Sequence, residues 1–145
     1  MKEKTNENII LLNLIYQNAQ MGLIGIDTVL PKVENEKLAS LMQKQRCEYE
    51  EFCKNVKKIL IKYGAQEEEI GKLKELSSTM MSKMMVMNAD DKKIAKLMME
   101  GNDKGVIAIQ EKLNADLSQD EEIINLAKKL LATEEHNINE MKEFI

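Results

Sequence analysis

The chain has 145 residues, which fits one domain (residues 1–145) with a hydrophobic core of its own. It contains one proline, six glycines and no tryptophan, and this balance favours an all-α protein over one built on sheets. The net charge is −4 and the Lys and Arg residues do not cluster, so we expect no nucleic-acid partner.

The N-terminal residues predict a soluble, cytoplasmic protein. Residues 1–8 are polar, and the apolar run Ile9–Ile15 that follows is interrupted by Asn13. This run is too short to span a membrane, and no cleavage site of a secretion signal follows it. Cys47 and Cys53 lack the spacing of a metal or redox motif and fit a reducing compartment. We therefore expect no membrane partner.

The first half of the chain predicts two long helices joined by a short turn. The first is expected over residues 5–30, because Pro31 bars its continuation. The second is expected over residues 34–63, because Gly64 suits the end of a helix. A turn this short makes the two helices antiparallel neighbours.

The second half predicts a helical connector and a second pair of helices. The connector is expected over residues 65–89, with three glutamates at its positive end. The last two helices are expected over residues 91–115 and 118–145, again antiparallel across a short turn. A connector of this length can run along a whole bundle, which makes the second and fourth helices parallel.

The last helix carries a capping signal and an acid on its apolar side. Ser118 and Glu121 have the spacing of a capping box. Glu134 falls near the middle of an apolar stripe formed by Ile123, Ala127, Leu130, Ile138, Met141 and Ile145. A buried carboxylate is costly unless it is paired or protonated, so we expect a raised pKa for Glu134.

Each of the four long helices has one polar residue on or beside its apolar stripe near mid-length. These residues are Asn18, Gln45, Asn102 and Glu134. Folding the first pair of helices about its turn sets Asn18 opposite Arg46 and beside Gln45, and folding the second pair sets Asn102 beside Glu134. We interpret the four as a hydrogen-bonded polar core layer that fixes the register between the two pairs.

Short segments spread along the chain carry a family resemblance. They are Leu11–Ile15, Lys37-Leu38 with Gln45-Arg46, Tyr63-Gly64, the region of Gly101, and His136. With them the layout resembles the ferritin-like superfamily, and most closely a rubrerythrin-like bacterial family of unknown function. The resemblance implies a four-helix bundle of two antiparallel hairpins joined by an additional crossover helix, with no assigned activity.

Ferritin-like bundles hold two iron or manganese ions with a Glu from each of two helices and a Glu-x-x-His pair from each of the other two. This chain departs from that pattern, because the matching positions read Asn18, Gln45-x-x-Glu48, Asn102 and Thr133-x-x-His136. Amides are poor ligands for hard divalent ions, because they bring no charge. We therefore expect no metal cofactor and no catalytic site.

A metal site remains the alternative. Its candidate ligands are Glu134, Glu48, Glu135 and His136, and its metal would be iron or manganese. His136 is the only histidine, and the helical wheel sets it more than 90° away from Glu134, which favours a surface position.

Methionines are the second unusual feature, since the chain has 11. Thioethers bind Cu(I), but methionines at helical spacing are more typical of adaptable core or contact surface. Of the methionines in the connector, Met80, Met84 and Met87 are expected to pack on the bundle, and Met81 and Met85 are left for another subunit. We expect self-association into a homo-oligomer through this Met80–Met87 side.

Enzyme motifs are missing from the sequence: it has no nucleophile elbow, phosphate loop, zinc ligand set or nucleotide fingerprint. We therefore expect a structural or interaction protein without catalytic activity. The alternative function is metal binding or storage at an incomplete carboxylate site.

Overall fold

The computed structural model describes residues 2–68, 71, 73–86 and 88–145. Its five α-helices are α1 (Lys2–Val29), α2 (Glu36–Lys62), α3 (Leu73–Val86), α4 (Asp91–Ala115) and α5 (Glu121–Met141), with short 3-10 helices at Leu30–Lys32 and Lys142–Phe144. The described residues contain no strand, which confirms the predicted all-α class.

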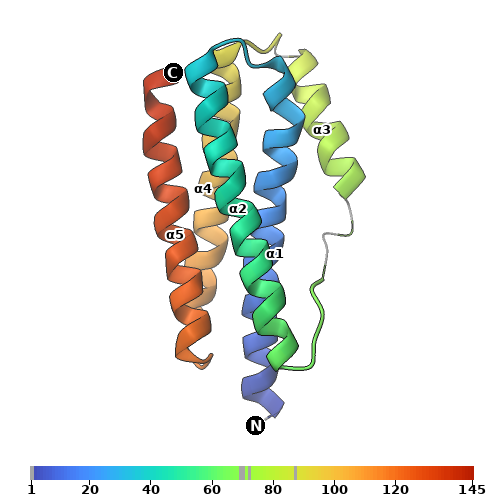
Figure 1. The fold of residues 1–145 in the computed structure, drawn as a ribbon, viewed down its shortest axis with the longest axis vertical. Coiled ribbons are helices and arrows are strands. Elements are labelled where there is room, and N and C mark those ends of the chain that lie inside the picture. The colour runs from blue at the N-terminus through green and yellow to red at the C-terminus, as the bar shows by residue number, and fades with distance from the viewer. Residues whose placement is uncertain (1, 69–70, 72, 87) are drawn as a thin grey trace.

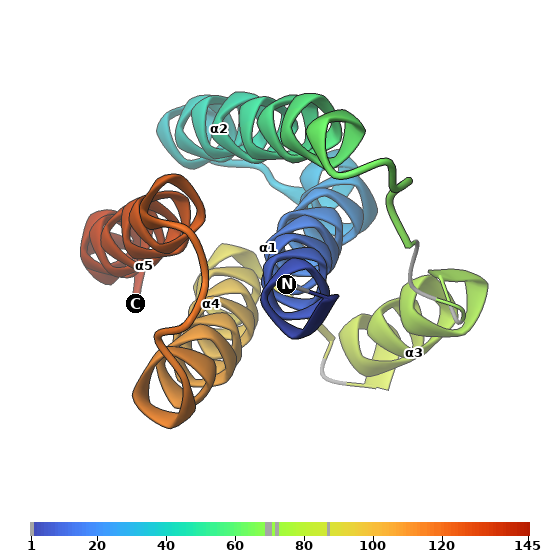
Figure 2. The same ribbon diagram turned by 90° about the horizontal axis from the view of Figure 1, so that it is seen from below.

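The four long helices lie side by side, with the shorter α3 on the outside (Figure 1). Helices α1 and α2 are antiparallel, as are α4 and α5, while α2 and α4 run in the same direction, as the length of the connector predicts. Seen from below, α1 lies between α2, α3 and α4, and α5 lies on the far side of α4 from α3 (Figure 2). The most extensive contacts join α1 to α2 and α4 to α5.

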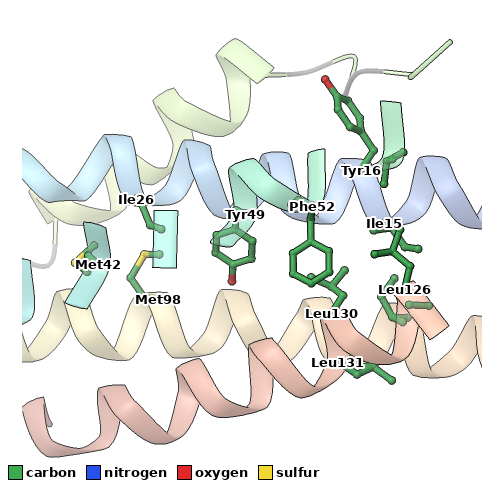
Figure 3. Close-up of a cluster of buried hydrophobic side chains, with 14 of the residues drawn as sticks. Ile15, Tyr16, Ile26, Met42, Tyr49, Phe52, Met98, Leu126, Leu130 and Leu131 are labelled. Atoms are coloured by element: carbon green, nitrogen blue, oxygen red, sulfur yellow. The ribbon is translucent and has the colours of Figure 1, made fainter. Parts of the chain in front are cut away.

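Apolar side chains from all five helices form one continuous core. Figure 3 shows Ile26, Met42 and Met98 in one part of this core and Phe52 in another, with Tyr49 between them. Burying a large apolar side chain contributes about 1.5–3 kcal/mol, so these stripes hold the helices together. Met84 of α3 is buried in the same core, so α3 is packed against the long helices.

The turn between α1 and α2 is longer than the sequence predicts. Pro31 ends α1 as expected, but the chain continues through a 3-10 turn before Asn35, whose side chain accepts hydrogen bonds from the first amides of α2. The Asp91 carboxylate accepts from the backbone N–H groups of Glu34 and Asn35 at 2.9 and 2.8 Å. Glu34 therefore lies outside α2, and the start of α4 is tied to this turn.

The connector is less helical than predicted, because α3 begins only at Leu73. The predicted helix over residues 65–89 is therefore wrong in its first part, where residues 65–68 have no helical structure. The backbone of Glu68 bonds instead to α1: its N–H donates to Asn13 Oδ1 at 2.7 Å, and its carbonyl accepts from Gln17 Nε2 at 3.1 Å. These bonds replace helical ones. Glu69 and Met87 lie outside the described residues.

The predicted capping box at the start of α5 is wrong. The Ser118 hydroxyl bonds to Asp116 at 3.0 Å, and the residue at the N-cap position is Asp120. The Asp120 side chain is occupied elsewhere, since one carboxylate oxygen accepts from Asn8 Nδ2 at 3.1 Å and from the hydroxyl of Tyr63. Bonds between helices thus replace the local cap.

By length and composition α1 can cross a membrane, since the segment Thr5–Lys32 holds an 18-residue window with a mean hydropathy of 1.4. The apolar run Ile9–Ile15, which is too short for a span by itself, lies within this longer segment. Of that window, 44% is buried against the rest of the protein. Core helices of soluble proteins and signal sequences have the same properties.

Candidate functional site

The structure buries all four residues of the predicted polar layer, which are Asn18, Gln45, Asn102 and Glu134. It brings three of them to one level of the molecule, around a residue that the prediction did not include, Tyr49 of α2. The fourth, Gln45, lies one helical turn before Tyr49. It is fully buried, and among the described residues neither its amide oxygen nor its amide nitrogen has a partner.

Tyr49 is the centre of this level. Its hydroxyl points toward α4 (Figure 3) and donates to Asn102 Oδ1 at 2.9 Å. Its ring lies against Gly22 of α1, where an added Cβ would come within 2.6 Å of the ring. Burial, with the nearby Glu134, raises the pKa of Tyr49 well above its usual range. The phenol is therefore neutral, and glycine at position 22 is what lets α1 and α2 approach each other at this level.

Glu134 lies against Gly105 of α4. A Cβ at Gly105 would clash with Glu134 Oε2 and lie 2.6 Å from Asn18 Oδ1, so a larger residue there would force these two side chains to move. Asn18 also donates from Nδ2 to the Gly105 carbonyl at 3.0 Å. Burial raises the pKa of Glu134 to about 8. The carboxyl is therefore mainly protonated at neutral pH.

The register of the first helix pair differs from the prediction. Arg46 was expected opposite Asn18, but its guanidinium bonds to Asp27, one carboxylate oxygen lying 2.7 Å from Nε. The 3-10 turn and the extended residues after it shift α2 along α1. In the second pair, Gly105 of α4 lies against Glu134, and Asn102 and Glu134 line the same cavity. Asn18 and Glu134 therefore both lie against Gly105, and Asn102 bonds to Tyr49.

Sequence reasoning missed Asn137, which is fully buried. In the orientation that satisfies both of its amide atoms, it donates to Glu48 Oε1 at 3.2 Å and to the Thr133 carbonyl at 3.3 Å. The signal was present, because Asn137 follows Glu134 by three residues and so shares its side of α5.

The alternative metal ligands do not come together. Glu134 is buried, whereas Glu135 and His136 are exposed, and His136 pairs with Glu140 at 3.2 Å. Glu48 is half-buried beside Asn137, and burial raises its pKa. Among the described residues no three His, Cys, Asp or Glu side chains form a group suited to a metal ion.

The polar level itself is a poor fit for the two cations of a ferritin-like centre. The amides of Asn18 and Asn102 are neutral, and Glu134 supplies the single carboxyl at this level. Two divalent cations need several anionic oxygen ligands to offset their charge. These side chains supply at most one.

A cavity of about 390 Å³ opens between α1, α3 and α4 and reaches this level. Tyr49 of α2 and Glu134 of α5 line its inner side, and Asn18 and Asn102 line it from α1 and α4. Four glycines also line it: Gly22, Gly25, Gly101 and Gly105. The polar level is thus one wall of a cavity whose lining is otherwise mainly apolar.

The methionines of α3 divide as the wheel predicts where they are described. Met80 is half-buried against the core and Met84 is buried, while Met81 and Met85 are 38% and 79% exposed. Met80 also lines the cavity. The exposed pair leaves an apolar strip on the outer side of α3.

Comparisons with protein-family models, with curated proteins and with solved structures gave no match to this chain.

Proposed function

We propose that this protein is a non-catalytic helical bundle of ferritin-like architecture that acts as a structural or interaction protein and associates with a second copy of itself. The observation that carries the proposal is the chemistry of the polar level. Where a ferritin-like enzyme needs several anionic ligands, this level has the amides of Asn18 and Asn102 and a single carboxyl, that of Glu134. These side chains are better suited to contacts between the helices than to the binding of metal ions.

Metal analysis tests the non-catalytic part. The protein is purified from cells grown with added iron and manganese, and its metal content is measured by mass spectrometry. We expect well under one metal ion per chain, and the same low content in Glu134→Gln. One or more ions per chain in the original protein would contradict the proposal.

Self-association is supported by the exposed methionines of α3. Met81 and Met85 lie beside each other on an outer helix, and flexible thioether side chains adapt to many contact shapes. An apolar strip of this kind can pair with the same strip on a second copy about a two-fold axis.

Light scattering coupled to size exclusion tests this part. We expect a dimer mass for the original chain and a monomer mass for the double variant Met81→Ser, Met85→Ser. Ile61→Ser is the control, because Ile61 is 75% exposed and lies on α2. A monomer mass for the original chain, or a dimer that survives the double variant, would contradict self-association through α3.

A metal-binding role is the alternative, and one observation favours it. The half-buried Glu48 interacts electrostatically with Lys44, Glu140 and His136, and His136 pairs with Glu140 at 3.2 Å. Under this alternative, calorimetric titration with Mn²⁺ gives saturable binding that Glu48→Gln abolishes. Under our proposal, neither protein shows saturable binding.

A further inference from the structure

We propose that the cavity between α1, α3 and α4 is a binding site for a small, uncharged, mainly apolar molecule that carries a hydrogen-bond acceptor such as a ketone or amide oxygen. This inference does not depend on self-association, because the cavity lies within one chain.

The size and lining of the cavity suit such a molecule. Its volume of about 390 Å³ lies within the range of about 300–1,000 Å³ that is usual for small-molecule sites. Apolar side chains from the three helices form most of the wall: Leu14, Met21, Met80, Leu97, Met98 and Ala108. Three of these are methionines, whose flexible side chains can follow the outline of a ligand.

Glycines keep the space open. A Cβ at Gly25 would already touch the methyl groups of Met98 and Met80, at 3.4 and 3.5 Å. Gly101 is exposed, and an added Cβ there would meet nothing within 4 Å, so a side chain at this lining position has room at the mouth of the cavity. Larger residues at these positions would fill the space and improve helix propensity. Glycine at these positions therefore leaves a space that helix packing by itself does not explain.

The inner end supplies polar groups that lack partners. Asn102 is 4% exposed, and its Oδ1 accepts from Tyr49, yet its Nδ2 has no partner among the described residues. Glu134 is 2% exposed, and its Oε2 also lacks a partner there. A buried donor without a partner costs about 1–3 kcal/mol, so a ligand that bonds to it regains that cost. The Nδ2 group needs an acceptor.

The same end selects against an anionic ligand. The side chains that meet there are the amides of Asn18 and Asn102, the phenol of Tyr49 and the carboxyl of Glu134. None of these four is cationic, and burying a charge without a partner is strongly unfavourable. Lys83 and Lys104 also line the cavity, but both are exposed residues on α3 and α4.

A fluorescent aromatic ketone tests the proposal. Prodan (6-propionyl-2-dimethylaminonaphthalene) is neutral and mainly apolar, it carries one carbonyl, and its emission moves to shorter wavelength in apolar surroundings. We expect saturable binding of one prodan per chain with such a shift. Ala108→Phe and Gly101→Phe should each weaken binding at least tenfold by filling the cavity. The control is Ile107→Phe, which adds an aromatic ring at an exposed position of the same helix and should leave the affinity unchanged.

The acceptor requirement is tested separately with 2-dimethylaminonaphthalene, which lacks the ketone. We expect it to bind about tenfold more weakly than prodan, because it lacks one hydrogen bond that contributes about 1.4 kcal/mol to the binding free energy. In Asn102→Leu, with its helix content checked by circular dichroism, the two probes should bind equally. Absence of saturable binding, or binding that neither cavity-filling variant weakens, would overturn the site. Equal affinities in the original protein would overturn the acceptor requirement.

Discussion

Two clusters of buried polar side chains differ in how completely they are bonded. At one end of the molecule, Asn8 accepts from the backbone N–H of Asp120 at 2.8 Å and donates to its carboxylate at 3.1 Å, while the Tyr63 hydroxyl donates to the same carboxylate. At mid-length, Tyr49 and Asn102 bond to each other, but atoms of Asn102, Glu134 and Gln45 have no partner in the described part of the chain.

The first cluster uses its hydrogen bonds to join helices, whereas the second cluster keeps hydrogen-bonding atoms without partners. The Asn8 cluster ties the start of α5 to α1 and to the end of α2, and it takes the place of a helix cap. The mid-length cluster borders the cavity and has donors and acceptors left over. Buried polar atoms without partners are rare in folded proteins, and they point to bound water or to a ligand.

The largest expected effect comes from closing the gap at Gly105. In Gly105→Leu the new side chain collides with Glu134 and Asn18, so we expect a loss of about 3 kcal/mol or more in the free energy of unfolding. Gly101→Ala is the control on the same helix, since its Cβ meets nothing, and it should be neutral or stabilise by up to about 1 kcal/mol. Urea unfolding measures both. Equal stabilities would show that a side chain at position 105 can be accommodated beside Glu134 and Asn18.

The next effect is a dependence of stability on pH that arises from Glu134. In the folded protein the Glu134 carboxyl keeps its proton up to about pH 8, whereas in the unfolded chain it releases the proton near the ordinary pKa of 4.5. The unfolded state therefore binds fewer protons between these values, and the contribution of Glu134 to stability falls as pH rises through this range. The slope is at most about 1.4 kcal/mol per pH unit.

Urea unfolding from pH 5 to pH 8 checks this effect. The decline should be smaller in Glu134→Gln, which cannot ionise, and should persist in Glu135→Gln, which changes the exposed neighbour. An identical pH profile for Glu134→Gln and the original chain would mean that Glu134 does not carry the effect.

The smallest effect is expected from the fully bonded cluster. Asn8→Ala removes two hydrogen bonds and leaves the buried side of Asp120 with fewer partners, so we expect a loss of about 1–3 kcal/mol. Asn6→Ala, at an exposed position of α1, should change stability by less than about 0.5 kcal/mol. Ligand binding in the cavity should be the same in both variants, because this cluster lies at the other end of α1 from Gly25. A weaker affinity for prodan in Asn8→Ala would show that the two clusters are coupled.

Much of the fold could be predicted from apolar periodicity. The bounds of α4 were predicted to the residue, and Ile123, Ala127 and Leu130 of the last stripe are fully buried as expected. The start of α3 could not be predicted, because the backbone of Glu68 bonds to Asn13 and Gln17, which lie more than fifty positions before it in the chain. Local propensity contains no information about such contacts.

The residue types of the site could be predicted, but the pairing expected between α1 and α2, with Asn18 opposite Arg46, was wrong. Periodicity identified Glu134 and the three amides as buried, but register depends on turn conformation, and an added 3-10 turn moved α2 along α1. The role of Tyr49 was missed because a tyrosine on an apolar stripe reads as core. The glycines near Asn18 and Asn102 could have indicated a cavity in the sequence. Whether a cavity forms depends on where α3 packs, which the sequence pattern does not give.

The measurement that tests the central claim most directly is the titration of the Glu134 carboxyl by carbon NMR, with the signal assigned from its absence in Glu134→Gln. If the interior at mid-length is uncharged at neutral pH, the signal should titrate with a pKa near 8. A pKa at or below the ordinary value of 4.5 would mean that a positive group or a metal ion stabilises the carboxylate, and it would contradict a neutral interior at this level of the bundle.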